Sequence, residues 1–229
     1  MNVRAHKSIT AGTLDRLRDA ILRAEYPPGQ KLRIEQIARS LDVSIGAVRE
    51  ALSRLTAEGM VIAEPQRGFV VTPISRRDLT ELTAVRIEVE TRCLDEAILH
   101  GDLDWEGRVQ SARHKLKVLG RAYESREEPG ATQWHTLHEL FHDELASGCP
   151  NQWWLKLRQQ LYIQSERYRR LAEGIAGPRR DVPAEHDAIA DAAIARNRQA
   201  ARQAMTDHLG RTTEVILNAP LQFADADHR

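Results

Sequence analysis

The first 75 residues alternate short apolar and polar stretches, and the spacing changes from helical to strand-like along them. Apolar positions recur with the period of an amphipathic helix in three stretches, and two short extended stretches follow. Ser44 can cap the third helix, and Gly59 stands just beyond its end. The predicted elements are helices over 9–25, 34–41 and 44–58 and strands over 60–63 and 69–72. Two short helices joined by a tight turn and followed by a strand–turn–strand hairpin predict a winged helix-turn-helix.

After a polar linker at 73–77, apolar residues recur only at helical spacing. The predicted helices cover 77–99, 103–125, 131–147, 151–174, 184–196 and 198–217, with glycine, proline or asparagine between them. The predicted fold is therefore mainly α, with a small β wing in domain 1–75 and an all-α antiparallel bundle in domain 78–220. The segment 221–229 is expected to be a disordered tail.

Composition and charge narrow the class of protein. The chain of 229 residues is 29% charged, and no apolar run approaches the roughly 20 residues of a membrane span. The first ten residues lack the apolar core of a secretion signal, and two cysteines give no disulfide framework, so a cytoplasmic location is expected. Residues 1–75 hold 11 Lys+Arg and 8 Asp+Glu, a net charge of +3, which leaves −3 for the remainder. A mildly basic head is compatible with contact to DNA phosphates.

The third predicted helix carries the features of a DNA-recognition helix. It would present Arg49 near its N-terminus, and an arginine fork can grip two acceptors of a base or phosphate at once. Gly68 in the wing would allow a close approach of the backbone to phosphate. The candidate DNA-contacting residues are Arg33, Ser44, Arg49, Arg54, Gln66, Arg67 and Gly68. The alternative reading is that these arginines are ordinary surface charges.

Arg86 is a polar residue on an apolar stripe of the first helix of domain 78–220, the helical body of the protein. It lies seven residues from both Leu79 and Cys93, so the three share one face. A buried arginine is costly unless it is paired. Two interpretations stay open: an acidic side chain elsewhere pairs with Arg86, or Arg86 binds the carboxylate of a small-molecule effector.

Histidines also occur on the apolar faces of the predicted body helices. His138 and His142 are four residues apart and therefore stack on one helix face, while His186 and His208 lie on the last two helices. A single such histidine is usually a core residue. Four of them favour a divalent metal, since neutral imidazole is a good ligand for zinc, nickel, copper and iron, and zinc or nickel is the metal expected here.

The head resembles the GntR family of bacterial regulators. The pattern Val-Ser-x-x-x-Val-Arg-Glu-Ala-Leu-x-x-Leu-x-x-Glu-Gly at 43–59, followed by Pro-x-Arg-Gly-x-x-Val at 65–71, carries the resemblance. It implies a homodimer that reads a palindromic operator, with Arg49 as a DNA-contacting arginine and Gly68 as the wing glycine. The chain departs from the common pattern at Ile45, where many members have arginine, and at Gly46-Ala47, where many have Thr-Pro. One base contact expected for the family is therefore missing.

The body resembles the FCD-type effector domain of the FadR branch of that family. The matching pieces are Phe-His-x-x-Leu at 141–145, Glu-His-x-x-Ile at 185–189 and Asp-His-Leu at 207–209, and the pattern of Arg86 and Glu90 is also similar. In metal-binding members the ligands are three histidines and a carboxylate, which implies His142, His186 and His208 here. His138 stands at the carboxylate's place. The resemblance also implies a small organic acid as the effector, bound at or near the metal with help from an arginine.

Together these patterns predict a DNA-binding transcriptional regulator that is not an enzyme and has no membrane partner. Two alternative functions are a metal-dependent hydrolase and a winged-helix module that binds protein. A histidine-rich metal site could serve a metal-dependent hydrolase, but the sequence has no nucleophile motif or phosphate-binding glycine loop, and the winged helix would be unexplained. A winged helix could instead bind another protein, but Arg49 and the arginine-containing wing argue for DNA.

Overall fold

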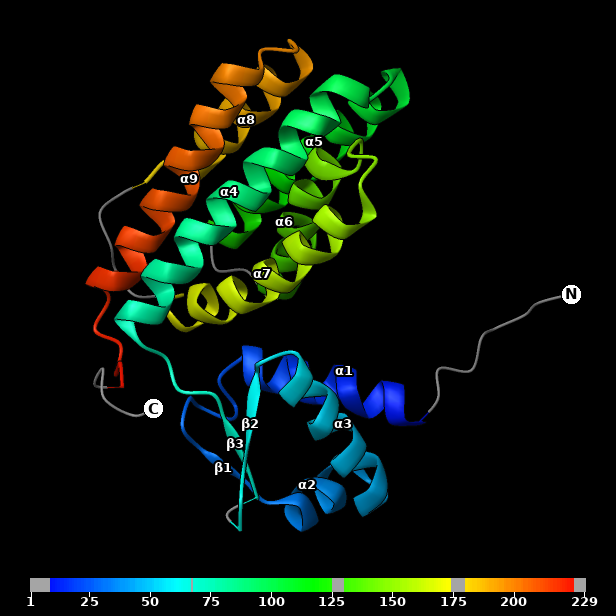
Figure 1. The fold of residues 1–229 in the computed structure, drawn as a ribbon, viewed down its shortest axis with the longest axis vertical. Helices are drawn as coiled ribbons and strands as arrows, with labels where there is room; N and C mark the ends of the chain where they lie inside the picture. The colour runs from blue at the N-terminus through cyan, green and yellow to red at the C-terminus, as the bar shows by residue number, and fades with distance from the viewer. Residues whose placement is uncertain (1–8, 67, 125–129, 174–179, 225–229) are drawn as a thin grey trace, which may run out of the picture. The chain divides into compact units, whose positions relative to one another are not determined.

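The computed structural model describes residues 9–66, 68–124, 130–173 and 180–224. Its contacts divide the chain into two compact units. One comprises residues 1–80 with 163–175 and 219–229, and the other comprises 81–162 with 176–218. Figure 1 shows the helices and strands of both units.

The head is built on three helices that enclose a small apolar core. They are α1 (Ile9–Leu22), α2 (Ile34–Leu41) and α3 (Ile45–Ala57). The hydroxyl of Ser44 accepts a hydrogen bond from the amide of Ala47 at 3.1 Å, which caps α3 as predicted. The core includes Leu17, Ile37, Val48, Leu52, Leu55 and Met60. Most of these residues are apolar positions at helical spacing along α1, α2 and α3, the pattern from which the three helices were predicted.

A three-stranded antiparallel sheet completes the head. Its strands are β1 (Lys31–Leu32), β2 (Val61–Glu64) and β3 (Gly68–Val71), in the order β1-β3-β2. The hairpin β2–β3 is the predicted wing, and Glu64 pairs with Gly68 next to its turn. Gly68 has a φ of +88°, which an L-residue rarely adopts. The sequence prediction missed β1, because a two-residue strand is too short to show an alternating pattern.

The body is all-helical, which confirms the predicted fold class. Its helices are α4 (Arg76–His100), α5 (Leu103–Glu124), α6 (Gly130–Ala146), α7 (Gln152–Leu171), α8 (Val182–Ile194) and α9 (Arg198–Asn218). Figure 1 shows them gathered into one bundle. Its core joins apolar residues of α4, α5, α6, α8 and α9, including Leu94, Trp105, Phe141, Ile189 and Met205.

Caps fix where α8 and α9 begin. Asp181 accepts a hydrogen bond from the amide of Ala184 at 2.9 Å, and Pro183 stands in the first turn of α8. Asn197 accepts one from the amide of Ala200 at 3.1 Å, at the start of α9. With their first turns fixed in this way, the two helices present defined faces to the bundle.

The segment expected to be a disordered tail begins at residue 221, and the structure places its first four residues. The amide of Ala224 donates to the carbonyl of Ile74 at 2.8 Å, and the guanidinium of Arg76 lies 4.6 Å from the ring centre of Phe223. Residues 225–229 lie outside the described residues. Among the helices described, none has the length and apolar character needed to cross a membrane.

Candidate functional site

Four buried histidines from three helices converge in the body. His138 and His142 project from α6, His186 from α8 and His208 from α9. Their exposed fractions are 5%, 0%, 4% and 4%, respectively. One candidate ligand nitrogen from each ring lies within 4.8 Å of all the others. The structure therefore brings together all four residues that the sequence singled out as metal ligands.

The spacing and the hydrogen bonding of these rings suit a metal ion. Tetrahedral zinc with Zn–N bonds of 2.0–2.1 Å needs ligand nitrogens about 3.4 Å apart, so small side-chain adjustments would bring the four into range. His142 is fully buried, and neither of its ring nitrogens has a hydrogen-bond partner among the residues that the structure describes. A buried polar nitrogen without a partner is costly, and a metal ion is one ligand that would satisfy it.

His138 is held in place by aromatic neighbours. Its ring stacks on Trp134, with centroids 4.7 Å apart and planes 20° from parallel. Its Nδ1 lies 3.3 Å from the hydroxyl of Tyr162 on α7. When Nδ1 is engaged by that hydroxyl, Nε2 is the nitrogen left for a metal. Sequence reasoning did not identify Trp134, which lies one turn before His138 on α6, or Tyr162, whose helix α7 carries none of the predicted site residues.

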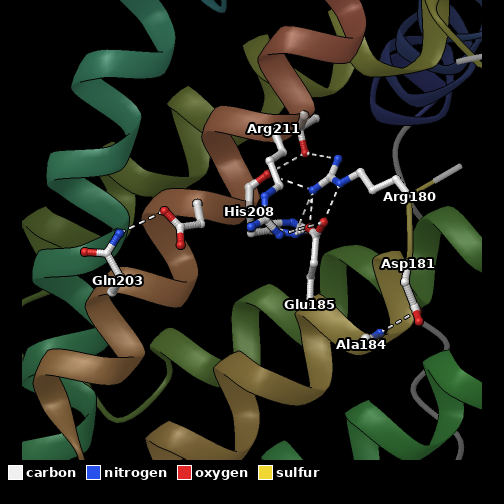
Figure 2. A network of polar contacts seen from close by, with 9 residues as sticks. Arg180, Asp181, Ala184, Glu185, Gln203, His208 and Arg211 are labelled. Atoms are coloured by element: carbon white, nitrogen blue, oxygen red, sulfur yellow. Dashed lines mark hydrogen bonds and ion pairs between the residues drawn. The ribbon is translucent and has the colours of Figure 1, made fainter. Parts of the chain in front are cut away.

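A carboxylate and a guanidinium support His208 from behind, as Figure 2 shows. Oε2 of Glu185, on α8, lies 2.9 Å from Nδ1 of His208. Arg180 forms a two-pronged ion pair with Glu185, and its Nε donates to Oε1 at 2.7 Å. Sequence reasoning missed Arg180 and Glu185, because both contact His208, which lies more than 20 positions further along the chain on α9.

A second charged cluster contains Arg86, which is 7% exposed. Its Nη2 lies 3.2 Å from Oε1 of Glu90, one turn along α4. Arg158 on α7 is 2% exposed, lies 3.5 Å from the same Glu90 oxygen, and also pairs with Asp143. The acidic partner left open by the sequence is thus Glu90. Sequence reasoning did not identify the second buried arginine, Arg158. It lies one turn before Tyr162 on the same face of α7.

The surroundings keep two of the histidines neutral. The pKa of His142 lies well below its ordinary value because of burial first, and then because of His208, His186, Arg86 and Arg158. Burial is also the main cause of the lowered pKa of His208. A neutral imidazole is the form that binds a metal.

Glu185 stays ionised despite its burial. Burial alone would raise the pKa of its carboxyl group, but the hydrogen bonds from His208 and Arg180 outweigh it and lower the pKa to about 2. The group beside His208 is therefore a carboxylate at neutral pH, which accepts hydrogen bonds and cannot donate them.

In the head, α3 presents its polar face to solvent. Arg49 is exposed and, among the described residues, makes no ion pair, whereas Arg54 pairs with Glu50 at 2.8 Å. The Ser44 oxygen is used to cap the helix, although its hydroxyl hydrogen can still be donated. Ile45, at the position where the resemblance leads one to expect arginine, is 46% exposed. Arg49 is consequently the most available cation on this helix.

The remaining candidate DNA-contacting residues lie in the wing and at the start of α2. Gln66 is exposed in the turn, with a φ of +63°, and Gly68 is exposed at the start of β3. Arg33 is exposed at the N-terminal end of α2. Arg67 lies outside the described residues. The described candidates are all at the surface, as contact with DNA requires.

An exposed helix α3 with a β wing, joined to an all-helical body, is the architecture of a DNA-binding transcriptional regulator. Comparison with known families gives the particular family. Residues 10–71 match the family described as bacterial regulatory proteins, gntR family, and residues 81–211 match the FCD domain. The chain therefore belongs to the GntR family of transcriptional regulators and carries an FCD domain.

Two curated relatives extend along most of the chain. It is 37% identical to the HTH-type transcriptional regulator BphR of Paraburkholderia xenovorans (strain LB400) over 92% of this chain and 86% of BphR. It is 28% identical to the HTH-type transcriptional repressor GlaR of Escherichia coli (strain K12) over 89% of this chain and 93% of GlaR. These relatives are regulators, which confirms the prediction that the protein is not an enzyme and removes the hydrolase alternative.

Solved structures share the fold. E. coli McbR/YncC superposes with a TM-score of 0.76 at 19% identity, covering 92% of this chain and 97% of that one. A putative GntR regulator from Rhodococcus sp. RHA1 gives a TM-score of 0.71 at 28% identity, covering 92% and 98%. The match extends over both the winged helix and the helical body.

Proposed function

We propose that this GntR-family regulator binds a palindromic operator as a homodimer in the cytoplasm, and that a small organic acid held near a divalent metal in the FCD domain controls its operator affinity. The observation that carries the proposal is the convergence of four buried histidines, with ligand nitrogens within 4.8 Å of one another. Zinc and nickel are the ions best suited to such a set of neutral imidazoles.

In the body, different residues would bind the metal and the effector. A bound divalent ion would supply positive charge for an effector carboxylate. His138, His142, His186 and His208 would hold that ion, and Arg86 would pair with the effector. Since Glu90 already neutralises part of the charge of Arg86, the effector carboxylate would share the guanidinium with it. Arg158, which pairs with the same oxygen of Glu90, adds a second buried guanidinium.

The head would read DNA in the way the helix-turn-helix geometry allows. Arg49 and the wing residues Gln66, Arg67 and Gly68 would contact bases and phosphates, with Arg33, Ser44 and Arg54 at the edges of the interface. A two-fold symmetric dimer presents two recognition helices to half-sites about 34 Å apart, one turn of DNA. Effector binding in the body would change operator affinity, and operator binding must then change effector affinity by the same factor.

The test begins with the metal content of protein purified without a polyhistidine tag or chelator. We expect about one zinc or nickel ion per chain by elemental analysis, and none in the double variant His142→Ala/His186→Ala. The double variant should still bind operator DNA in an anisotropy titration, because the head has its own core. A matched control is His100→Ala, which removes an exposed histidine outside the cluster.

The metal centre, the effector and the role of the head in DNA binding can fail separately. Wild-type protein that contains no metal and gains no thermal stability from added zinc or nickel would overturn the metal centre. Metal-loaded protein whose operator affinity is unchanged across a panel of mono-, di- and tricarboxylates would overturn the organic-acid effector. Operator binding that is absent under all of these conditions would contradict the proposed role of the head.

A further inference from the structure

His208, one of the four clustered histidines, has a carboxylate next to its ring. Nδ1 of His208 lies 2.9 Å from Oε2 of Glu185, and both side chains are at most 10% exposed. Glu185 directly precedes His186 on α8, whereas His208 is on α9. One short segment of α8 therefore supplies a candidate ligand to the cluster and a carboxylate to a second candidate ligand.

This contact determines which nitrogen of His208 carries the proton. A carboxylate only accepts hydrogen bonds, so a contact of 2.9 Å requires Nδ1 to carry hydrogen. Nη2 of Arg180 also lies 3.2 Å from Nδ1, but that nitrogen already donates to Glu185 and to the carbonyl of His208. The guanidinium is thus satisfied without a lone pair on Nδ1. The Nδ1–H form leaves the lone pair of Nε2 available for a metal.

Arg180 keeps the carboxylate in this position. It contacts both oxygens of Glu185, and it also donates to Oγ1 of Thr212 at 2.8 Å and to the carbonyl of His208 at 2.8 Å. Thr212 donates to the same carbonyl at 2.8 Å. Figure 2 shows Arg180 and Glu185 meeting His208 between α8 and α9. These contacts of Arg180 fix Glu185 as a partner of Nδ1, because a move of the carboxylate toward the metal would break its two contacts with Arg180 and its contact with His208.

We propose that Glu185, clamped by Arg180, is a positioning residue that holds His208 in its Nδ1–H form and thereby sets the metal affinity of the histidine cluster. The inference rests on the proposed metal site. A hydrogen-bonded carboxylate behind a ligating imidazole fixes the orientation of the ring and raises its basicity, and loss of such a partner typically weakens metal binding by 10–100-fold.

The test compares wild type with Glu185→Gln, which keeps the size of the side chain and removes its charge. Metal-free proteins are titrated with zinc against a chromophoric chelator, and with cobalt while the visible spectrum is recorded. We expect Glu185→Gln to bind zinc at least tenfold more weakly. The matched control is Asp187→Asn, which removes a carboxylate two residues further along α8 that pairs with Lys117 at 2.7 Å. Its zinc affinity should stay within twofold of wild type.

A second measurement needs no metal. Long-range 1H–15N spectra of metal-free wild type should show His208 as the Nδ1–H tautomer, and Glu185→Gln should shift this resonance toward a mixture. Zinc affinity of Glu185→Gln within twofold of wild type, or His208 as the Nε2–H tautomer in wild type, would overturn the inference. A lower melting temperature of Glu185→Gln with unchanged zinc affinity would also overturn it, because the role of Glu185 would then be structural only. If wild type binds no zinc, the proposed metal site fails, and the tautomer still tests the contact.

Discussion

His138 and His142 lie one turn apart on α6 with their ring centroids 4.7 Å apart, and the ring of each also lies within 6.5 Å of His186 and His208. A close group of buried imidazoles is an expensive arrangement in a core unless something binds the nitrogens, because each ring carries polar atoms that lose water. The buried imidazoles that would bind a metal should therefore lower the stability of the metal-free protein.

The first prediction concerns His142→Leu. Within the described part of the chain, neither ring nitrogen of His142 has a hydrogen-bond partner, so replacing the ring by an apolar side chain of similar size should stabilise the metal-free protein by about 1 kcal/mol. The same change should abolish the stabilisation produced by zinc. Urea unfolding with and without metal measures both effects. A less stable metal-free variant would show that the ring nitrogens are satisfied in some other way.

The pH dependence of the metal-free protein follows from the lowered pKa values of His142 and His208. The unfolded chain takes up protons near pH 6.5, whereas these folded-state groups resist protonation. Their stabilising contribution is therefore complete above about pH 6.5 and is lost as the pH falls below it, by up to about 1.4 kcal/mol per pH unit for each histidine. Arg86, Arg158 and His186 face the same cluster and add to the cost of a further positive charge.

Urea unfolding of chelator-treated protein between pH 7.5 and 5.5 measures this slope. We expect His142→Leu to reduce it, because one of the resisting groups is gone. Bound metal should move the loss of stability to lower pH, because protons must compete with the ion for the same nitrogens. An unfolding free energy that is flat over this range would contradict the assignment of neutral, buried histidines.

The third prediction concerns DNA. Arg49→Ala should weaken operator binding by about 1–3 kcal/mol and relax specificity at one base pair of each half-site, if Arg49 grips a base edge. Anisotropy titrations at several salt concentrations measure this. The control, Arg202→Ala, removes an exposed arginine of α9 and should leave operator affinity unchanged. Equal affinities of Arg49→Ala and wild type would remove Arg49 from the interface.

The fourth prediction concerns assembly. Light scattering at micromolar concentration should give twice the 25.9 kDa mass of the chain, because a palindromic site is matched by a two-fold symmetric dimer. The operator complex should contain two chains. A monomeric mass both in the presence and in the absence of operator DNA would contradict the proposed mode of recognition.

The sequence predicted the elements well, and particular residues show why. Local signals such as the Ser44 cap, Gly59 beyond α3 and the apolar stripes of the body depend on neighbours within one or two turns, so they can be read without the fold. The two-residue strand β1 was missed because its pairing with β3 links residues nearly 40 positions apart.

For the site, the sequence by itself determined which histidines lie on apolar faces, since helical periodicity fixes the direction of each side chain relative to its own helix. Only the tertiary structure decided that the faces of α6, α8 and α9 meet around one point, and that Glu90 links Arg86 to Arg158. It also decided that Arg180 and Glu185 stand behind His208. The physical reason is that periodicity specifies a buried face, whereas the packing of whole helices selects which distant face it is buried against.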